Sequence, residues 1–131
     1  MNRTVVGWSR STLPAVLAAV ATLAACARVP PPPPPELREG YPDRGARLIQ
    51  EYGCGSCHVV PGVRRADGLV GPPLTRFGAR SYIAGALPNN AENLQRWIQD
   101  PQSVEPGTAM PDLGVTETDA RDIAAYLFTL E

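Results

Sequence analysis

The sequence predicts an all-α domain in which short helices are joined by long loops. Two observations predict this class of fold. Apolar residues recur three and four positions apart in segments 43–52, 91–99 and 116–130, which is the spacing of amphipathic helices rather than strands. Glycine and proline are frequent, with 12 and 15 of the 131 residues, and they interrupt the chain between these segments. The length allows one domain, and no internal repeat is present.

The first helix is expected near Asp43 to Tyr52, and Gly53 follows it as a stop signal. Residues three and four positions apart lie on one face of a helix. The buried face is therefore expected to consist of Gly45, Leu48, Ile49 and Tyr52.

The second helix is expected near Ala91 to Gln99. Asn90 is a suitable N-cap because its side chain can accept a hydrogen bond from a free amide of the first turn. Pro101 is expected to stop the helix. The buried stripe is expected to consist of Leu94, Trp97 and Ile98.

The third helix is expected to begin at Thr116-Glu117-Thr118-Asp119, which has the pattern of a capping box. In this motif the Thr116 hydroxyl satisfies a free amide while the Asp119 carboxylate reaches back. The apolar face is expected to consist of Ala120, Ile123, Ala124 and Leu127, flanked by Tyr126 and Leu130. Segments 71–74 and 107–114 are predicted loops.

After the first helix comes Cys54-Gly55-Ser56-Cys57-His58. C-x-x-C-H is the covalent attachment sequence of c-type haem. Its two thiols can add across the vinyl groups of one porphyrin, and the adjacent imidazole is held beneath the iron. The motif predicts one covalent haem c, with Cys54 and Cys57 as attachment points and His58 as an iron ligand. The haem would supply an apolar centre for a small domain to fold around.

A C-x-x-C pair has three other interpretations. It occurs in thioredoxin-like redox dithiols, where a βαβ context is expected, and as half of a zinc site, which needs further Cys or His ligands. Neither context follows in this sequence. A structural disulfide is the third alternative.

Met110 is the candidate for a second iron ligand. The chain has one histidine and two methionines, of which Met1 is the initiator. Met110 lies in the run Pro106-Gly107-Thr108-Ala109-Met110-Pro111. The alternative is a methionine that only fills space in a loop or core.

The N-terminus has the features of an export signal. Arg3 and Arg10 precede an apolar stretch, 13–25, which is shorter than the approximately 20 residues that span a bilayer. It ends in Leu23-Ala24-Ala25-Cys26, which resembles the lipobox of bacterial lipoproteins. We expect residues 1–25 to be a lipoprotein signal peptide and Cys26 to be lipidated. The alternatives are ordinary cleavage nearby, which leaves Cys26 free, or an uncleaved anchor.

Six consecutive prolines, Pro30 to Pro35, follow Cys26 closely. Such a run forms a stiff polyproline II rod of about 19 Å. We expect residues 26–39 to be a tether and 40–131 to be the folded domain. A proline-rich recognition motif is the competing interpretation.

Residues 40–131 resemble a class I cytochrome c. The matching pieces are the C-x-x-C-H motif, Gly71-Pro72, the loop from Asp100-Pro101 to Met110, and the terminal helix around Tyr126. The resemblance implies that the Pro72 carbonyl accepts the His58 Nδ1 hydrogen, and that the first and last helices cross with Gly45 close to Tyr126.

The resemblance also implies polar partners for the haem propionates or residues that pack on the ring. The candidates are Arg80, Tyr82, Trp97 and Thr108. Trp97 could instead be simple core and Arg80 a solvated charge. The run from Leu87 to Pro101 further resembles the cytochrome c domain fused to subunit II of caa3-type terminal oxidases. No copper-centre domain or transmembrane helix precedes it here, so we expect a freestanding lipoprotein.

Ligation by His58 and Met110 would leave the iron no open position, and the thioether would raise its potential. We therefore expect an electron carrier without a catalytic site or small-molecule substrate, on the outer side of a bacterial membrane, facing the periplasm or cell exterior. Its expected partners are a terminal oxidase or a quinol-cytochrome c oxidoreductase. The alternatives are an electron-transfer subunit of a periplasmic dehydrogenase, and a sensor or peroxidase with an open iron.

Charge narrows the class of partner. All 12 basic residues are arginine, so a lysine-ringed docking face is excluded. Segment 64–80 carries a net charge of +3, whereas segment 99–131 carries −6. The whole chain has a net charge of −1, which disfavours nucleic-acid binding.

Overall fold

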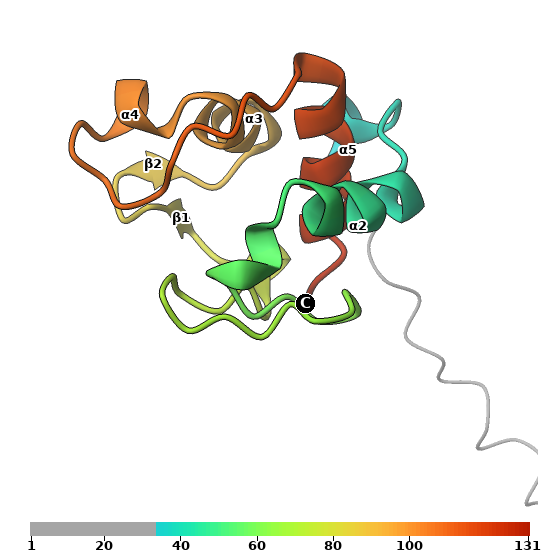
Figure 1. Ribbon diagram of the computed structural model, residues 1–131. Coiled ribbons are helices and arrows are strands. Elements are labelled where there is room, and N and C mark those ends of the chain that lie inside the picture. The colour runs from blue at the N-terminus through green and yellow to red at the C-terminus, as the bar shows by residue number, and fades with distance from the viewer. Residues whose placement is uncertain (1–33) are drawn as a thin grey trace, which may run out of the picture. The chain divides into compact units, whose positions relative to one another are not determined.

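A computed structural model describes residues 34–131 of the chain (Figure 1). The predicted signal peptide, Cys26 and most of the proline run lie outside these residues. None of the helices in residues 34–131 combines the length and the hydrophobicity that a bilayer-spanning helix needs. The elements, in chain order, are η1 Pro35–Leu37, α2 Pro42–Glu51, η2 Cys54–Ser56, η3 Phe77–Ala79, β1 Tyr82–Ile83, β2 Leu87–Pro88, α3 Ala91–Gln99, α4 Pro101–Val104 and α5 Glu117–Leu127.

The three predicted helices are confirmed as α2, α3 and α5. Helix α3 begins where the sequence predicts, because the Asn90 side chain accepts a hydrogen bond from the Asn93 amide (2.9 Å). Pro101 does end α3, but it also begins the four-residue helix α4, in a segment that the family resemblance places in a loop. Proline suits the first position of a helix, and Asp100 caps α4 through the Ser103 amide (3.0 Å).

A two-stranded antiparallel sheet was also not predicted. Ile83 pairs with Leu87 and Tyr82 with Pro88. Ala84 and Gly85 turn the chain with φ of 51° and 75°. Strands of two residues are too short to produce a period in the sequence.

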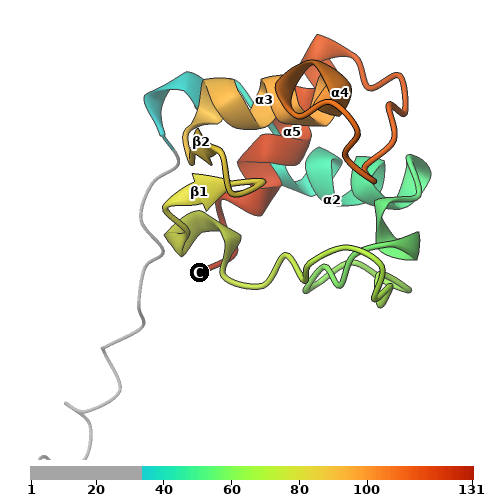
Figure 2. The ribbon, with the colours of Figure 1, turned by 90° about the vertical axis from the view of Figure 1, so that its left-hand side faces the viewer.

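Helix α5 packs against both α2 and α3 at the centre of the core (Figures 1 and 2). The predicted crossing of the first and last helices depends on Gly45. A Cβ at this position would lie 2.7 Å from the Asp122 carbonyl carbon and 3.0 Å from Tyr126 Cβ. Glycine therefore lets the backbones of α2 and α5 meet directly.

Polar groups fix the same crossing. Arg44 on α2 forms ion pairs with Asp119 and Asp122 on α5. Asp122, 1% exposed, also accepts a hydrogen bond from the Tyr41 amide (2.8 Å). Tyr52 donates its hydroxyl hydrogen to Asp119 (2.7 Å). We call these residues the Arg44 network.

The Arg44 network gives the predicted capping box further partners. Thr116 Oγ1 accepts from the Asp119 amide (3.2 Å), as expected. The Asp119 carboxylate also accepts hydrogen bonds from Arg44 on α2 and from Tyr52 just after it, two partners that the capping pattern does not predict. The Tyr52 hydrogen bond is the main cause that lowers the pKa of Asp119.

The chain joins the core before Gly40. Leu37 at the end of η1 is fully buried, at 0% exposure, and η1 contacts α3 and α5. The packed part of the chain thus includes a residue N-terminal to the predicted domain boundary.

Candidate functional site

Cys54, Cys57 and His58 lie on one tight turn directly after α2. The Cys57 and His58 amides both donate to the Cys54 carbonyl, at 3.2 and 3.0 Å. A hydrogen bond from the Gly68 amide to the Gly55 carbonyl (3.0 Å) ties the turn to the following loop. Two thiols and one imidazole are thereby held close together on one segment.

The two cysteines are not joined in a disulfide. Burial raises the pKa of the Cys54 thiol above its ordinary value of 9.0. A redox-active dithiol requires the opposite shift, toward the thiolate. Among residues 34–131, no group of three or more His, Cys, Asp or Glu side chains could hold a metal ion, so a zinc site has no support there.

His58 is oriented by backbone on one side of its ring. Nδ1 lies 2.7 Å from the Pro72 carbonyl oxygen, the contact that the family resemblance implies. A carbonyl oxygen can only accept, so the hydrogen resides on Nδ1 and the lone pair of Nε2 is free to ligate a metal. Gly71 makes the approach possible, because a Cβ there would lie 2.6 Å from His58 Nδ1.

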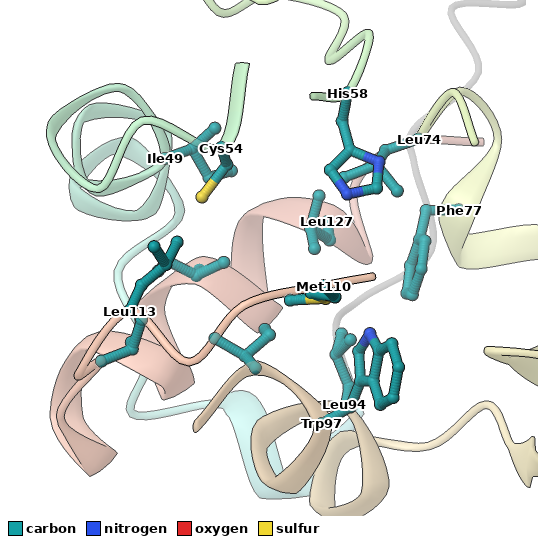
Figure 3. Close-up of a pocket in the computed structure, with 13 residues that line it drawn as sticks. Ile49, Cys54, His58, Leu74, Phe77, Leu94, Trp97, Met110, Leu113 and Leu127 are labelled. Carbon is teal, nitrogen blue, oxygen red and sulfur yellow. The ribbon is translucent and has the colours of Figure 1, made fainter. Parts of the chain in front are cut away.

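These groups border a cavity of about 520 Å³. A smaller, apolar recess of about 70 Å³ is bordered by several of the same residues and by core side chains of α2, α3 and α5 (Figure 3). Figure 3 shows that His58, Met110 and Trp97 point into the same space from three different segments. The volume of the larger cavity, about 520 Å³, and its mainly apolar walls are typical of a cofactor site.

All the residues predicted from the sequence to contact the haem border the larger cavity. The set comprises Cys54, Cys57, His58, Pro72, Arg80, Tyr82, Trp97, Thr108 and Met110. The apolar walls and the paired cysteines fit a haem bound by two thioether bonds.

The four residues expected to contact the haem propionates or the ring differ in their exposure and in the hydrogen bonds that they form within the protein. Arg80 donates to the Pro73 and Thr75 carbonyls and lies 5.4 Å from the centre of the Phe77 ring. Thr108 Oγ1 accepts from the Met110 amide at 3.4 Å. Tyr82 is 62% exposed at the mouth of the cavity. Trp97 projects from α3 into the cavity, and no hydrogen bond of its indole is found among residues 34–131.

Sequence reasoning passed over Gln102 on α4. Its side chain binds the backbone of the segment that carries Met110. An exposed glutamine in a proline-rich stretch has no pattern that marks it, so only the structure could identify this contact.

The family model for cytochrome c matches residues 42–131. This chain belongs to the cytochrome c family. Its all-α fold of short helices and loops is confirmed, and its cofactor is a covalently attached haem c. A haem iron accepts and releases one electron at a time, and the protein supplies the orientation and surroundings of the group.

This cytochrome c is similar to several longer proteins named cytochrome c oxidase subunit 2. It is 41% identical to that of Alkalihalophilus pseudofirmus over 97 residues, which is 73% of this chain and 28% of the relative. The identity is 40% over 83 residues with the Bacillus subtilis protein and 39% over 82 residues with that of Bacillus sp. PS3. Each alignment covers 23% of those two relatives, so the cytochrome spans about a quarter of the proteins it matches.

Proposed function

We propose that this cytochrome c passes single electrons to a terminal oxidase on the outer side of a bacterial cytoplasmic membrane. The observation that carries the proposal is the 41% identity to a region of cytochrome c oxidase subunit 2. In that relative the region belongs to an oxidase subunit, whereas here we propose a separate carrier. A quinol-cytochrome c oxidoreductase is the corresponding donor.

The proposed ligand set makes the protein a carrier rather than a catalyst. His58 Nε2 is free to bind iron, and Met110 borders the same cavity. With both positions filled, no site remains for a substrate, and the thioether raises the potential. Arg80, Tyr82, Trp97 and Thr108 are the proposed partners of the propionates and the ring.

The proposed location depends on the sequence of residues 1–39. A signal peptide that ends before Cys26 would export the chain to the compartment where haem c is attached, and a lipid on Cys26 would hold it at the membrane. In a Cys26→Ser variant we expect the exported protein to be recovered in the soluble fraction. Wild-type protein that is released from membranes by salt alone would contradict the lipid anchor.

Electron delivery can be measured directly. The cytochrome is purified, reduced, and mixed in a stopped-flow instrument with a purified cytochrome c oxidase whose subunit 2 is related to this chain. We expect rapid oxidation of the haem, together with oxygen consumption that depends on the cytochrome concentration. The reduced cytochrome mixed with buffer that contains no oxidase is the control. Oxidation no faster than in the control would refute the partnership.

A further inference from the structure

Both the NH₂ group and the carbonyl oxygen of the Gln102 side chain form hydrogen bonds with the backbone of the loop that carries Met110. Its Nε2 donates to the carbonyls of Thr108 (2.9 Å) and Met110 (3.1 Å). Its Oε1 accepts from the Gly107 amide (3.0 Å). The pattern fixes the orientation of the amide, because a flip would place NH₂ donors against the Gly107 N–H.

Helix α4, which carries Gln102, is held in place at its start. Pro101 is buried, and α4 follows α3 directly through Asp100. The Asp100 side chain accepts from the Ser103 amide (3.0 Å), and the Ser103 hydroxyl donates to the Asp100 carbonyl (2.9 Å). A single helical turn is thus capped at its start and continuous with a core helix.

The loop makes one further backbone hydrogen bond to the end of α4, from the Thr108 amide to the Glu105 carbonyl (3.1 Å). Among residues 34–131, the carbonyls of Thr108 and Met110 accept hydrogen bonds only from Gln102. The Met110 amide has a single contact, at 3.4 Å, with Thr108 Oγ1 inside the same loop. Gln102 is therefore the main tie between the Met110 backbone and the rest of the domain.

We propose that Gln102 is a positioning residue that keeps the Met110 side chain in the haem cavity. The inference rests on the proposed ligation of iron by Met110. Without the three hydrogen bonds, the loop can leave the cavity wall and carry the thioether with it. Gln102 would thereby set how often the sixth position of the iron is open, although its own side chain binds only the loop.

The test compares Gln102→Ala with Gln99→Ala in the haem-loaded protein. Gln99 is a matched control because, within residues 34–131, its Nε2 donates only to the Gln95 carbonyl of its own helix (3.0 Å). The readouts are carbon monoxide binding by the ferrous protein, the sulfur-to-iron charge-transfer absorption of the ferric protein, and the reduction potential. We expect Gln102→Ala to raise the open fraction about tenfold or more, since three hydrogen bonds are lost. Gln99→Ala should match wild type.

Gln102→Glu separates the two kinds of contact. Its carboxylate can still accept from the Gly107 amide but cannot donate to the two carbonyls. We expect it to bind carbon monoxide at least as readily as Gln102→Ala. Binding at the wild-type level in both variants, with haem content and helicity unchanged, would overturn the positioning role.

Met110→Ala keeps the two proposals distinguishable. It should bind carbon monoxide fully and lose the charge-transfer absorption. If it does so while both Gln102 variants behave like wild type, Met110 ligates iron and the positioning role is wrong. If Met110→Ala leaves binding and absorption unchanged, the ligation itself is wrong, and the positioning role is refuted with it.

Discussion

His58 is held by the two residues that pass beside its ring. The Pro72 carbonyl accepts from Nδ1 at 2.7 Å, and Gly71 leaves no room for a side chain between backbone and imidazole. The first contact fixes the tautomer, and the second brings the carbonyl within reach. Both are properties of the backbone, so the residue type matters at position 71 and much less at 72.

Gly71→Ala should therefore displace the His58 ring. The added Cβ would lie 2.6 Å from Nδ1, and such overpacking costs roughly 1–3 kcal/mol. We expect a less stable holoprotein with an altered iron spectrum, measured by denaturant unfolding and visible absorption. Pro72→Ala, which keeps the carbonyl, is the control and should resemble wild type. Equal behaviour of the two variants would argue against the tight approach.

Tyr52→Phe tests the Asp119 carboxylate in the Arg44 network. The Tyr52 hydroxyl is the largest cause that depresses the pKa of Asp119 below its ordinary value of 3.8. A depressed pKa in the folded state stabilises the fold above the unfolded pKa, and the gain is lost as pH falls through the folded pKa. We expect Tyr52→Phe to be less stable than wild type at neutral pH, and the difference to disappear in acid.

The control for this series is Tyr126→Phe. The Tyr126 hydroxyl donates to the Pro61 carbonyl (2.5 Å), which does not titrate. Its loss should lower the free energy of unfolding by an amount that does not vary between neutral and acidic pH. A Tyr52→Phe difference that is equally constant would show that Asp119 is not the titrating partner.

The residues that sequence reasoning identified are those whose chemistry is local. Cys54, Cys57 and His58 occupy one turn, so their spacing alone predicts haem attachment. The capping box places Asp119 at the start of its own helix because the capping box is a local pattern. Its further partners, Tyr52 and Arg44, are distant in sequence and come together with it only when α2 crosses α5.

Among the elements, the close contact between α2 and α5 requires glycine at position 45, where a side chain would have no room. Gly45→Ala would place a Cβ 2.7 Å from the Asp122 carbonyl carbon, and neither backbone can yield without separating the helices. Alanine is otherwise better than glycine in a helix by about 1 kcal/mol. We expect destabilisation in spite of that gain, seen as a lower midpoint in denaturant.

Arg47→Ala on the same helix provides the comparison, because Arg47 is exposed. It should change stability by no more than about 0.5 kcal/mol. A Gly45→Ala variant as stable as Arg47→Ala would mean that α2 and α5 do not touch at this point.

The long helices could be predicted, and the short elements could not. Helices α2, α3 and α5 each show two or more turns of apolar spacing, with a cap or a stop at one end. Helix α4 and the strands β1 and β2 have four residues or fewer. Their positions are decided by neighbours, such as the Asp100 cap and the turn at Ala84-Gly85, rather than by any period.

At the scale of the whole molecule, the larger cavity is a substantial part of a small domain. The larger cavity has a volume of about 520 Å³ and mainly apolar walls. Apolar walls left in contact with water lose the stabilisation that burial gives, and small domains have little core to spare. We therefore expect the bound haem to form part of the core and the fold to depend on it.

Cys54→Ala/Cys57→Ala should remove the covalent haem and leave the chain largely unfolded. Circular dichroism and limited proteolysis measure the outcome. Each single variant retains one thioether and is the matched control, expected to stay folded with haem. A protease-resistant double variant without haem would contradict the dependence of the fold on its cofactor.

Leu37 fixes the point at which the N-terminal segment joins the domain. Its side chain is fully buried, and η1 contacts α3 and α5. Leu37 borders neither cavity, but it belongs to the same hydrophobic core as Leu94 and Leu127, which border the smaller recess. If residues 26–39 form the proposed tether, a force on that tether would be borne by the core packing behind the proposed iron ligands.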